Sequence, residues 1–117
     1  MHTLASQAQP YFRNYVRSGG KAHRKKQVGR IIKFLDWAEE TQRVRTLDGL
    51  GKRQVVGFWK AHRGLSDATA NKYWLGINKL WQWLGKHHEP PKPIRPKPHE
   101  SFLPSILESA KTKQKGL

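Results

Sequence analysis

The sequence predicts an all-α domain of four helices, followed by a proline-rich linker and a short helical stub. Apolar residues recur at helical spacing in four segments, and no segment shows the strict alternation of a half-buried strand. Turn residues separate these segments. At 117 residues the chain has room for one domain with a modest core, and its 5 Trp, 4 Phe and 3 Tyr favour a folded core over disorder.

The clearest helix is predicted over Ser66–Leu84. Ser66 suits the N-cap, Asp67 suits the positive end of the helix dipole, and Gly85 can adopt the left-handed conformation that ends a helix. One side of this helix is an apolar arc of Ala70, Tyr73, Trp74, Ile77, Leu80, Trp81 and Leu84. The opposite side carries the amides and ammonium groups of Asn71, Lys72, Asn78, Lys79 and Gln82. Trp83 falls on neither side.

A second long helix is predicted over Lys21–Thr41. Its core arc consists of Val28, Ile31, Ile32, Phe34, Leu35 and Ala38. Lys26, Arg30 and Lys33 project from the opposite side, together with Trp37. We expect Trp37 to pack against the preceding helix rather than to stack on a nucleic-acid base.

The remaining helices are shorter. Apolar residues at helical spacing predict the first helix within Thr3–Val16, which either begins near Gln9 with Pro10 in its first turn or is kinked at Pro10. Ser18-Gly19-Gly20 ends it. The third helix is predicted over Lys52–His62, with the inward-facing residues Val55, Val56, Phe58 and Trp59. Leu47 and Leu50 are expected to anchor the connection over residues 42–51 to the core.

The C-terminal third of the chain changes character. Five prolines fall between Pro90 and Pro98, interleaved with Lys and Arg, which predicts a stiff, extended linker of polyproline type. We therefore expect a four-helix domain over residues 1–86, a basic linker over residues 87–100, and a short helix or frayed tail over residues 101–117.

The charge of the chain limits its partners. Lys and Arg total 23 against 8 Asp and Glu, a formal charge of +15, for which a polyanion is the simplest partner. Nucleic acid is the first choice and an anionic membrane surface the second. No apolar run is long enough to span a bilayer, no signal-peptide pattern opens the chain, and cysteine is absent, so the cytoplasm is the expected compartment. We expect no cofactor, metal or small-molecule substrate, because phosphate-binding loops, paired carboxylates and metal-ligand spacings are all missing from the sequence.

Several of these segments resemble the N-terminal core-binding domain of the tyrosine recombinases, or phage integrases. Arg24–Ala38 is similar to the family's second helix, which ends in a Phe-Leu-x-Trp pattern. Gly64–Tyr73 and Ile77–Leu84 are similar to its fourth helix, with a Leu-Ser-x-x-Thr start and an aromatic-rich end. The proline run resembles the interdomain linker, and Phe102-Leu103-Pro104 resembles the opening of the catalytic domain.

The resemblance implies a SAM-like, orthogonal four-helix bundle that clamps double-stranded DNA with its second and fourth helices, beside other recombinase protomers on the DNA. It also implies a bacterial, archaeal or phage-encoded protein that is nucleoid-associated when bound. The DNA-binding residues carried over are Lys25, Lys26, Arg30, Lys33, Thr69, Asn71, Lys72, Asn78, Lys79 and Gln82. The family's catalytic Arg, Lys, His-x-x-Arg and Tyr set is not found in this sequence, so no strand cleavage is expected from it.

Two other classes of function remain open at this point. A stand-alone protein-interaction or regulatory module would use its charge only for solubility, and it would show no saturable binding to duplex DNA. A single-stranded nucleic-acid binder would stack bases on exposed Trp37 and Trp83.

Overall fold

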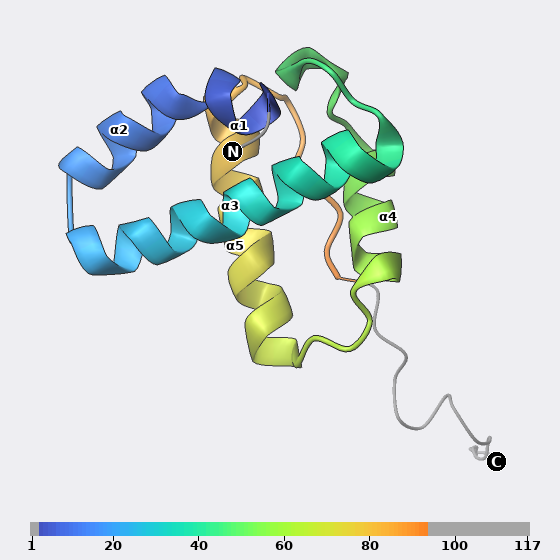
Figure 1. Cartoon of the computed structure of the whole chain (residues 1–117). Helices are drawn as coiled ribbons and strands as arrows, with labels where there is room; N and C mark the ends of the chain where they lie inside the picture. The colour runs from blue at the N-terminus through green and yellow to red at the C-terminus, as the bar shows by residue number, and fades with distance from the viewer. Residues whose placement is uncertain (1–2, 94–117) are drawn as a thin grey trace, which may run out of the picture.

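One long central helix organises the domain. The computed structural model describes residues 3–93, and this part of the chain is all-helical and contains no strand. The helices are α1 (Thr3–Gln7), α2 (Gln9–Arg17), α3 (Lys21–Gln42), α4 (Lys52–Ala61) and α5 (Asp67–Trp83). Figure 1 shows α3 crossing the molecule, and α3 packs against each of the other four helices. The prediction of an all-α fold is confirmed.

Pro10 divides the first predicted helix into two. A short helix α1 ends at Gln7, and α2 begins at Gln9 with Pro10 in its first turn, where the missing N–H costs no intrahelical hydrogen bond. The carboxylate of Glu39 on α3 caps α1: it accepts hydrogen bonds from the backbone N–H groups of Leu4 at 2.8 Å and Thr3 at 3.4 Å. An acid at the C-terminal end of α3, poorly placed for its own helix dipole, is therefore well placed for the dipole of α1.

The other helices begin and end close to their predicted limits. Ser66 caps α5, because its hydroxyl oxygen accepts from the backbone N–H of Thr69 at 3.1 Å. Gly85 follows α5 with a φ of 70°, as predicted. Leu50 is buried and Leu47 packs against the core, so both anchor the connection before α4.

The core forms where α3 meets its neighbours. Phe34 of α3 contacts Phe58 of α4 edge-to-face, with ring centroids 5.4 Å apart, and lies 6.3 Å from the ring of Trp81 on α5. The largest fully buried side chains are Leu4, Ile31, Phe34, Leu35, Leu50, Val55, Phe58, Ile77, Leu80 and Trp81.

The two tryptophans in doubt both pack within the domain. Trp37 was expected to pack against the first helix, but the neighbours of its ring are Phe58 and His62 at the end of α4, with centroids 5.7 and 6.3 Å away. The Trp37 ring fits against α4 because Gly57 has no side chain: an added Cβ there would lie 2.9 Å from the ring. Trp83 instead stacks on Tyr11 of α2, with centroids 5.7 Å apart and planes 4° from parallel.

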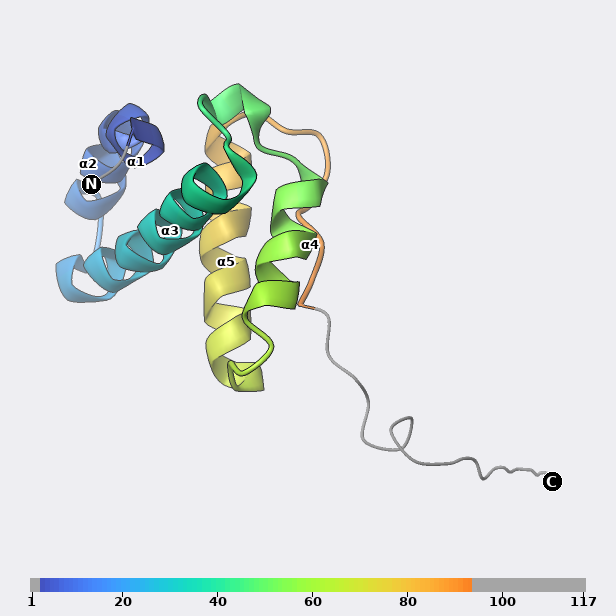
Figure 2. The same ribbon diagram turned by 45° about the vertical axis from the view of Figure 1, so that its right-hand side comes forward.

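The beginning of the predicted linker is bound to the domain. After α5 the chain turns and runs back beside α4 and α5 (Figure 2). The indole N–H of Trp59 on α4 donates to the carbonyl of Pro91, and that of Trp74 on α5 donates to the carbonyl of Pro90, both at 2.9 Å. Pro90 is buried. Residues 86–93 thus bridge two helices, whereas the rest of the linker and the predicted C-terminal helix lie outside the described residues.

Candidate nucleic-acid interface

Charge is separated along the length of α3. The chain contains no Asp or Glu before Asp36, whereas eight Lys and Arg residues precede it. The acids Asp36, Glu39 and Glu40 occupy the other end of the helix. Cations in the first turns and anions in the last turns both oppose the helix dipole, and each such placement typically costs about 0.3–1 kcal/mol. This arrangement does not stabilise α3.

The cationic half of α3 crosses α5 at Gly76. A Cβ built on Gly76 would lie 3.2 Å from both Gln27 and Ile31, so the missing side chain lets the two helices approach closely. At the crossing, the side-chain amide of Gln27 donates to the backbone carbonyl of Lys72 at 3.2 Å, and Arg30 donates to Gln27 Oε1 at 2.6 Å. These contacts join α3 to the backbone of α5 at Lys72 and orient the side chain of Arg30 at the crossing.

A stripe of polar residues runs along α5 on a side of the helix that does not face the crossing at Gly76. Asn71, Asn78 and Gln82 are spaced so that they lie on this side, and Asn71 and Gln82 are exposed. Leu75 lies between them and is the exposed large hydrophobic residue of the described chain, at 48 % exposure. We call Asn71, Leu75, Asn78 and Gln82 the α5 stripe. The three amides were predicted from the sequence as base-contacting residues, whereas Leu75 was not.

Lys79 borders the α5 stripe on the side of α2. Its ammonium lies 5.9 Å from the ring centroid of Tyr15, and the guanidinium of Arg24 lies 4.5 Å from the same centroid. Arg24 also donates to the backbone carbonyl of Tyr15 at 2.9 Å and to Ser18 Oγ at 3.2 Å. Arg24 therefore ties the end of α2 to α3, while Lys79 extends the basic surface from the crossing toward α2.

Three of the predicted residues have additional neighbours. Lys25 lines a groove between α2 and α3, about 100° around the helix from Lys26. Thr69 is part of the α5 N-cap, because its hydroxyl accepts from Ser66 Oγ at 3.0 Å. Lys33 lines a hollow together with Asp36, Trp37 and His62, although its spacing puts it on the same side of α3 as Lys26 and Arg30. Lys26, Arg30 and Lys33 thus share one side of α3, and Asn71, Asn78 and Gln82 share one side of α5.

Gln27 is the residue at this surface that the sequence did not reveal. It is the one buried polar side chain among residues 3–93, at 6 % exposure, and it contacts both α5 and Arg30. Its position three residues before Arg30 and four before Ile31 puts it on the apolar side of α3, where a glutamine needs partners for its amide. A glutamine among the apolar positions of α3 was therefore the sequence signal that could have identified this residue.

No other chemistry appears in the described part of the molecule. Within residues 3–93, no three His, Asp or Glu side chains come together in a way that could hold a metal ion. Nor is any helix of that part long and apolar enough to cross a membrane. Comparisons with protein-family models, with curated proteins and with solved structures find no match.

Proposed function

We propose that the domain binds double-stranded DNA through the crossing of α3 and α5, without catalysing a reaction on it. The observation that carries this proposal is the cationic half of α3 lying across α5 at Gly76, with Gln27 bonded both to Arg30 and to the backbone carbonyl of Lys72. Lys and Arg side chains gain affinity for a polyanion by releasing counterions from its phosphates. The Lys and Arg residues in the first turns of α3 are unfavourably placed for the dipole of their own helix, which is consistent with a role in binding phosphates.

The α5 stripe supports a duplex rather than a polyanion in general. Asparagine and glutamine amides can pair with the major-groove edge of adenine, and an apolar side chain can contact the methyl group of thymine. Asn71, Asn78 and Gln82 supply the amides and Leu75 supplies the apolar group, on one side of one helix. Since an α-helix fits the major groove of B-form DNA, α5 is the element that would enter it.

The resemblance to tyrosine recombinases gives this proposal its finer form. In that form the helices make a SAM-like orthogonal bundle of the core-binding type, with α3 and α5 in the roles of the family's second and fourth helices. Steeply crossed α3 and α5 and an all-helical domain are compatible with it (Figure 1). Binding of single-stranded nucleic acid by stacking bases on Trp37 and Trp83 has less support, because both rings already have aromatic neighbours within the domain.

The proposal is tested by a double variant at two exposed positions, Lys26→Glu with Lys72→Glu. Binding to a labelled duplex is followed by fluorescence anisotropy at several salt concentrations. If each lysine contacts a phosphate, the slope of log affinity against log salt falls by about two. Urea unfolding should be unchanged within about 0.5 kcal/mol, since neither side chain is buried.

A matched control uses Lys52→Glu with Arg53→Glu, both exposed in the first turn of α4. Each substitution lowers the formal charge by two, so both double variants change from +15 to +11. The control should keep nearly the parent's salt slope. Equal binding by the two variants would reject the α3–α5 surface, and no saturable duplex binding by the parent would reject DNA binding itself. Leu75→Ala should weaken binding without altering the slope, because it touches no phosphate.

A further inference from the structure

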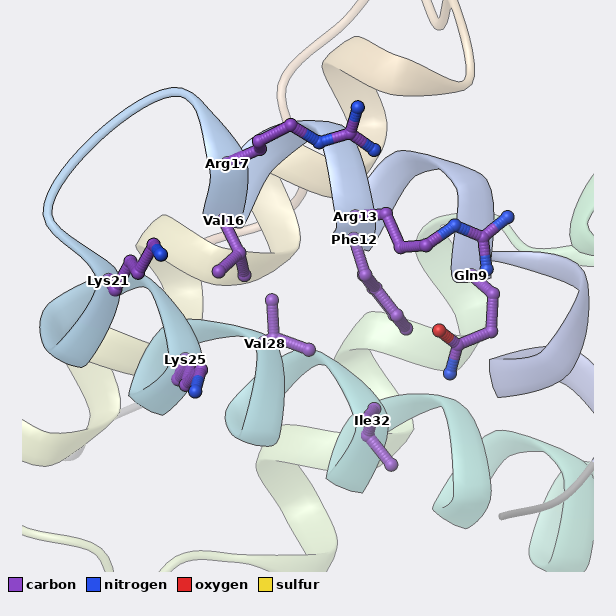
Figure 3. A pocket seen from close by; sticks show the side chains of 9 residues that line it. All are labelled: Gln9, Phe12, Arg13, Val16, Arg17, Lys21, Lys25, Val28 and Ile32. Atoms are coloured by element: carbon purple, nitrogen blue, oxygen red, sulfur yellow. The ribbon is translucent and has the colours of Figure 1, made fainter.

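A second surface lies on the opposite side of α3, where α2 and α3 diverge. An open groove of about 550 Å³ runs between the two helices. Figure 3 shows Phe12 and Val16 of α2 pointing toward α3, and Val28 and Ile32 of α3 pointing toward α2. Val16, Val28 and Ile32 are only half-buried, whereas a closed helix pair would pack such side chains to the density of a protein interior. The groove therefore has an apolar floor that nothing in the described chain covers.

The groove stays open because the contacts that hold α2 in place lie on the side of the helix pair away from the groove. Arg24 binds the carbonyl of Tyr15 and lies over its ring, and Trp83 stacks on Tyr11. These contacts hold α2 against α3 and α5 on the side away from Val16 and Val28. The floor is thus a lasting feature of the fold and not a gap that the helices could close without losing those contacts.

The rim of the groove is cationic. Arg13 and Arg17 come from α2, and Lys21 and Lys25 come from the first turns of α3; all four are exposed. No acidic residue lines the groove. The complementary ligand carries apolar groups along its centre and negative charges along both flanks.

We infer that this groove binds an acidic amphipathic helix of a partner protein. A helix with apolar residues at positions i, i+3, i+4 and i+7 can lay that stripe between two helices, as in other helix-in-groove complexes. Glutamates and aspartates beside the stripe would then meet the arginines and lysines of the rim. The nine residues of α2 span about 14 Å, which three turns of a partner helix match.

Other occupants fit less well. Contact with apolar side chains does not stabilise charged phosphates. Duplex DNA would therefore explain the cationic residues of the rim but not the apolar residues Val16, Val28 and Ile32. A membrane needs apolar groups that project outward, whereas these point into a concave groove (Figure 3). A second copy of this domain offers no matching helix among its described residues, because exposed Leu75 is flanked by amides and lysines.

The test uses two synthetic, fluorescein-labelled peptides of fourteen residues. One has Leu and Ile at i, i+3, i+4 and i+7 with Glu at the flanking positions, and the other is a scramble with the same composition and charge. Fluorescence anisotropy should show saturable binding of the amphipathic peptide that is at least about tenfold tighter than binding of the scramble. Equal affinity for the two peptides, or no saturation, would overturn the proposal.

Variants then locate the site. Arg13→Glu with Arg17→Glu should lower the affinity for the amphipathic peptide at least about tenfold. The uncharged pair Val28→Ala with Ile32→Ala should lower it by a similar factor. The matched control Lys52→Glu with Arg53→Glu should leave peptide affinity within about twofold. Urea unfolding of each variant shows whether a loss of peptide binding comes from the site or from the fold. If the pair Val28→Ala with Ile32→Ala fails to fold, the exposed pair Arg13→Glu with Arg17→Glu still tests the proposal.

A competition experiment separates the groove from the proposed DNA surface. An unlabelled duplex should leave the bound peptide in place, and Arg13→Glu with Arg17→Glu should keep most of the parent's duplex affinity. If the duplex displaces the peptide and the same pair abolishes duplex binding, the groove belongs to a nucleic-acid surface and the helix proposal is wrong. Because the peptide assay needs no DNA, its success does not depend on the proposed function.

Discussion

The side-chain amide of Gln27 donates a hydrogen bond to the backbone carbonyl of Lys72 at 3.2 Å, joining α3 to α5 across 45 positions of the chain. The other end of the same amide accepts from Arg30 at 2.6 Å. One buried glutamine therefore joins the two helices and orients Arg30 at their crossing. The integrity of the proposed DNA surface depends on this residue, although the side chain itself is only 6 % exposed.

Replacing Gln27 by methionine should lower the free energy of unfolding by about 1–2 kcal/mol. Methionine has a similar volume but cannot donate to the Lys72 carbonyl or accept from Arg30. Urea denaturation followed by circular dichroism measures the loss, and affinity for duplex DNA should fall as well, because Arg30 loses the group that orients it.

Gln82→Met is the control for this substitution. Gln82 is fully exposed, so the same change there should alter unfolding by less than about 0.5 kcal/mol. Equal stability of the two variants would mean that the buried amide does not join the helices.

Gly76 and Gly29 should respond to substitution with opposite signs. Gly76→Val should destabilise the domain by about 1–3 kcal/mol, because the contacts at 3.2 Å with Gln27 and Ile31 leave no room for a branched side chain. Gly29 is also inside a helix, but a Cβ there meets nothing within 4 Å. Gly29→Ala should therefore stabilise by about 0.5–1 kcal/mol through backbone entropy alone. Thermal unfolding measures both, and a stabilising Gly76→Val would disprove the close crossing.

Trp83 should prove to be a structural residue that holds α2. Its ring stacks on Tyr11 and meets Tyr15 edge-on at 5.4 Å. Trp83→Ala should cost about 2–3 kcal/mol, below the usual loss for a fully buried tryptophan, because the ring is half-buried. Trp83→Phe keeps part of the aromatic contact and should lose less. In proton NMR spectra the ring-current shifts of Tyr11 should disappear in the alanine variant; their persistence would contradict the stacking.

Truncation should reveal where the folded unit ends. A chain ending at Lys86 lacks the carbonyls of Pro90 and Pro91, so the indole N–H groups of Trp59 and Trp74 lose their acceptors. At about 1 kcal/mol for each hydrogen bond, the free energy of unfolding should fall by about 2 kcal/mol. A chain ending at Pro93 keeps both contacts and should be more stable than the shorter chain by that amount. Equal stability of the two truncated chains would show that residues 87–93 add nothing to the fold.

The helices were largely predictable because local signals define them. The Ser66 cap, Gly85 and the turn at residues 18–20 set helix ends that match those of α2, α3 and α5. Pro10 left open either a helix start near Gln9 or a kinked helix; α2 begins at Gln9, and the separate α1 was not predicted. The finer SAM-like arrangement remains a prediction, since hydrophobic periodicity says which face is buried but not against which helix.

Side-chain partners were less predictable because they depend on tertiary packing. The proline run was expected to be an extended linker, yet its first carbonyls accept hydrogen bonds from two tryptophans whose N–H groups would otherwise be buried without acceptors. Trp37 packs on α4 because Gly57 leaves space there, which no helical projection of α3 could reveal. Adjacent lysines at positions 25 and 26 lie on different sides of α3, since neighbours on a helix are separated by about 100°.

The separation of charge along α3 has a kinetic consequence. With its cations at one end and its anions at the other, this helix carries a charge dipole of its own, and the proposed DNA partner would be attracted to its cationic end. Encounters would then begin with the crossing of α3 and α5 already turned toward the charged surface. Salt should act first on the rate of association, and reversing the polarity of α3 should slow productive encounters even at constant net charge.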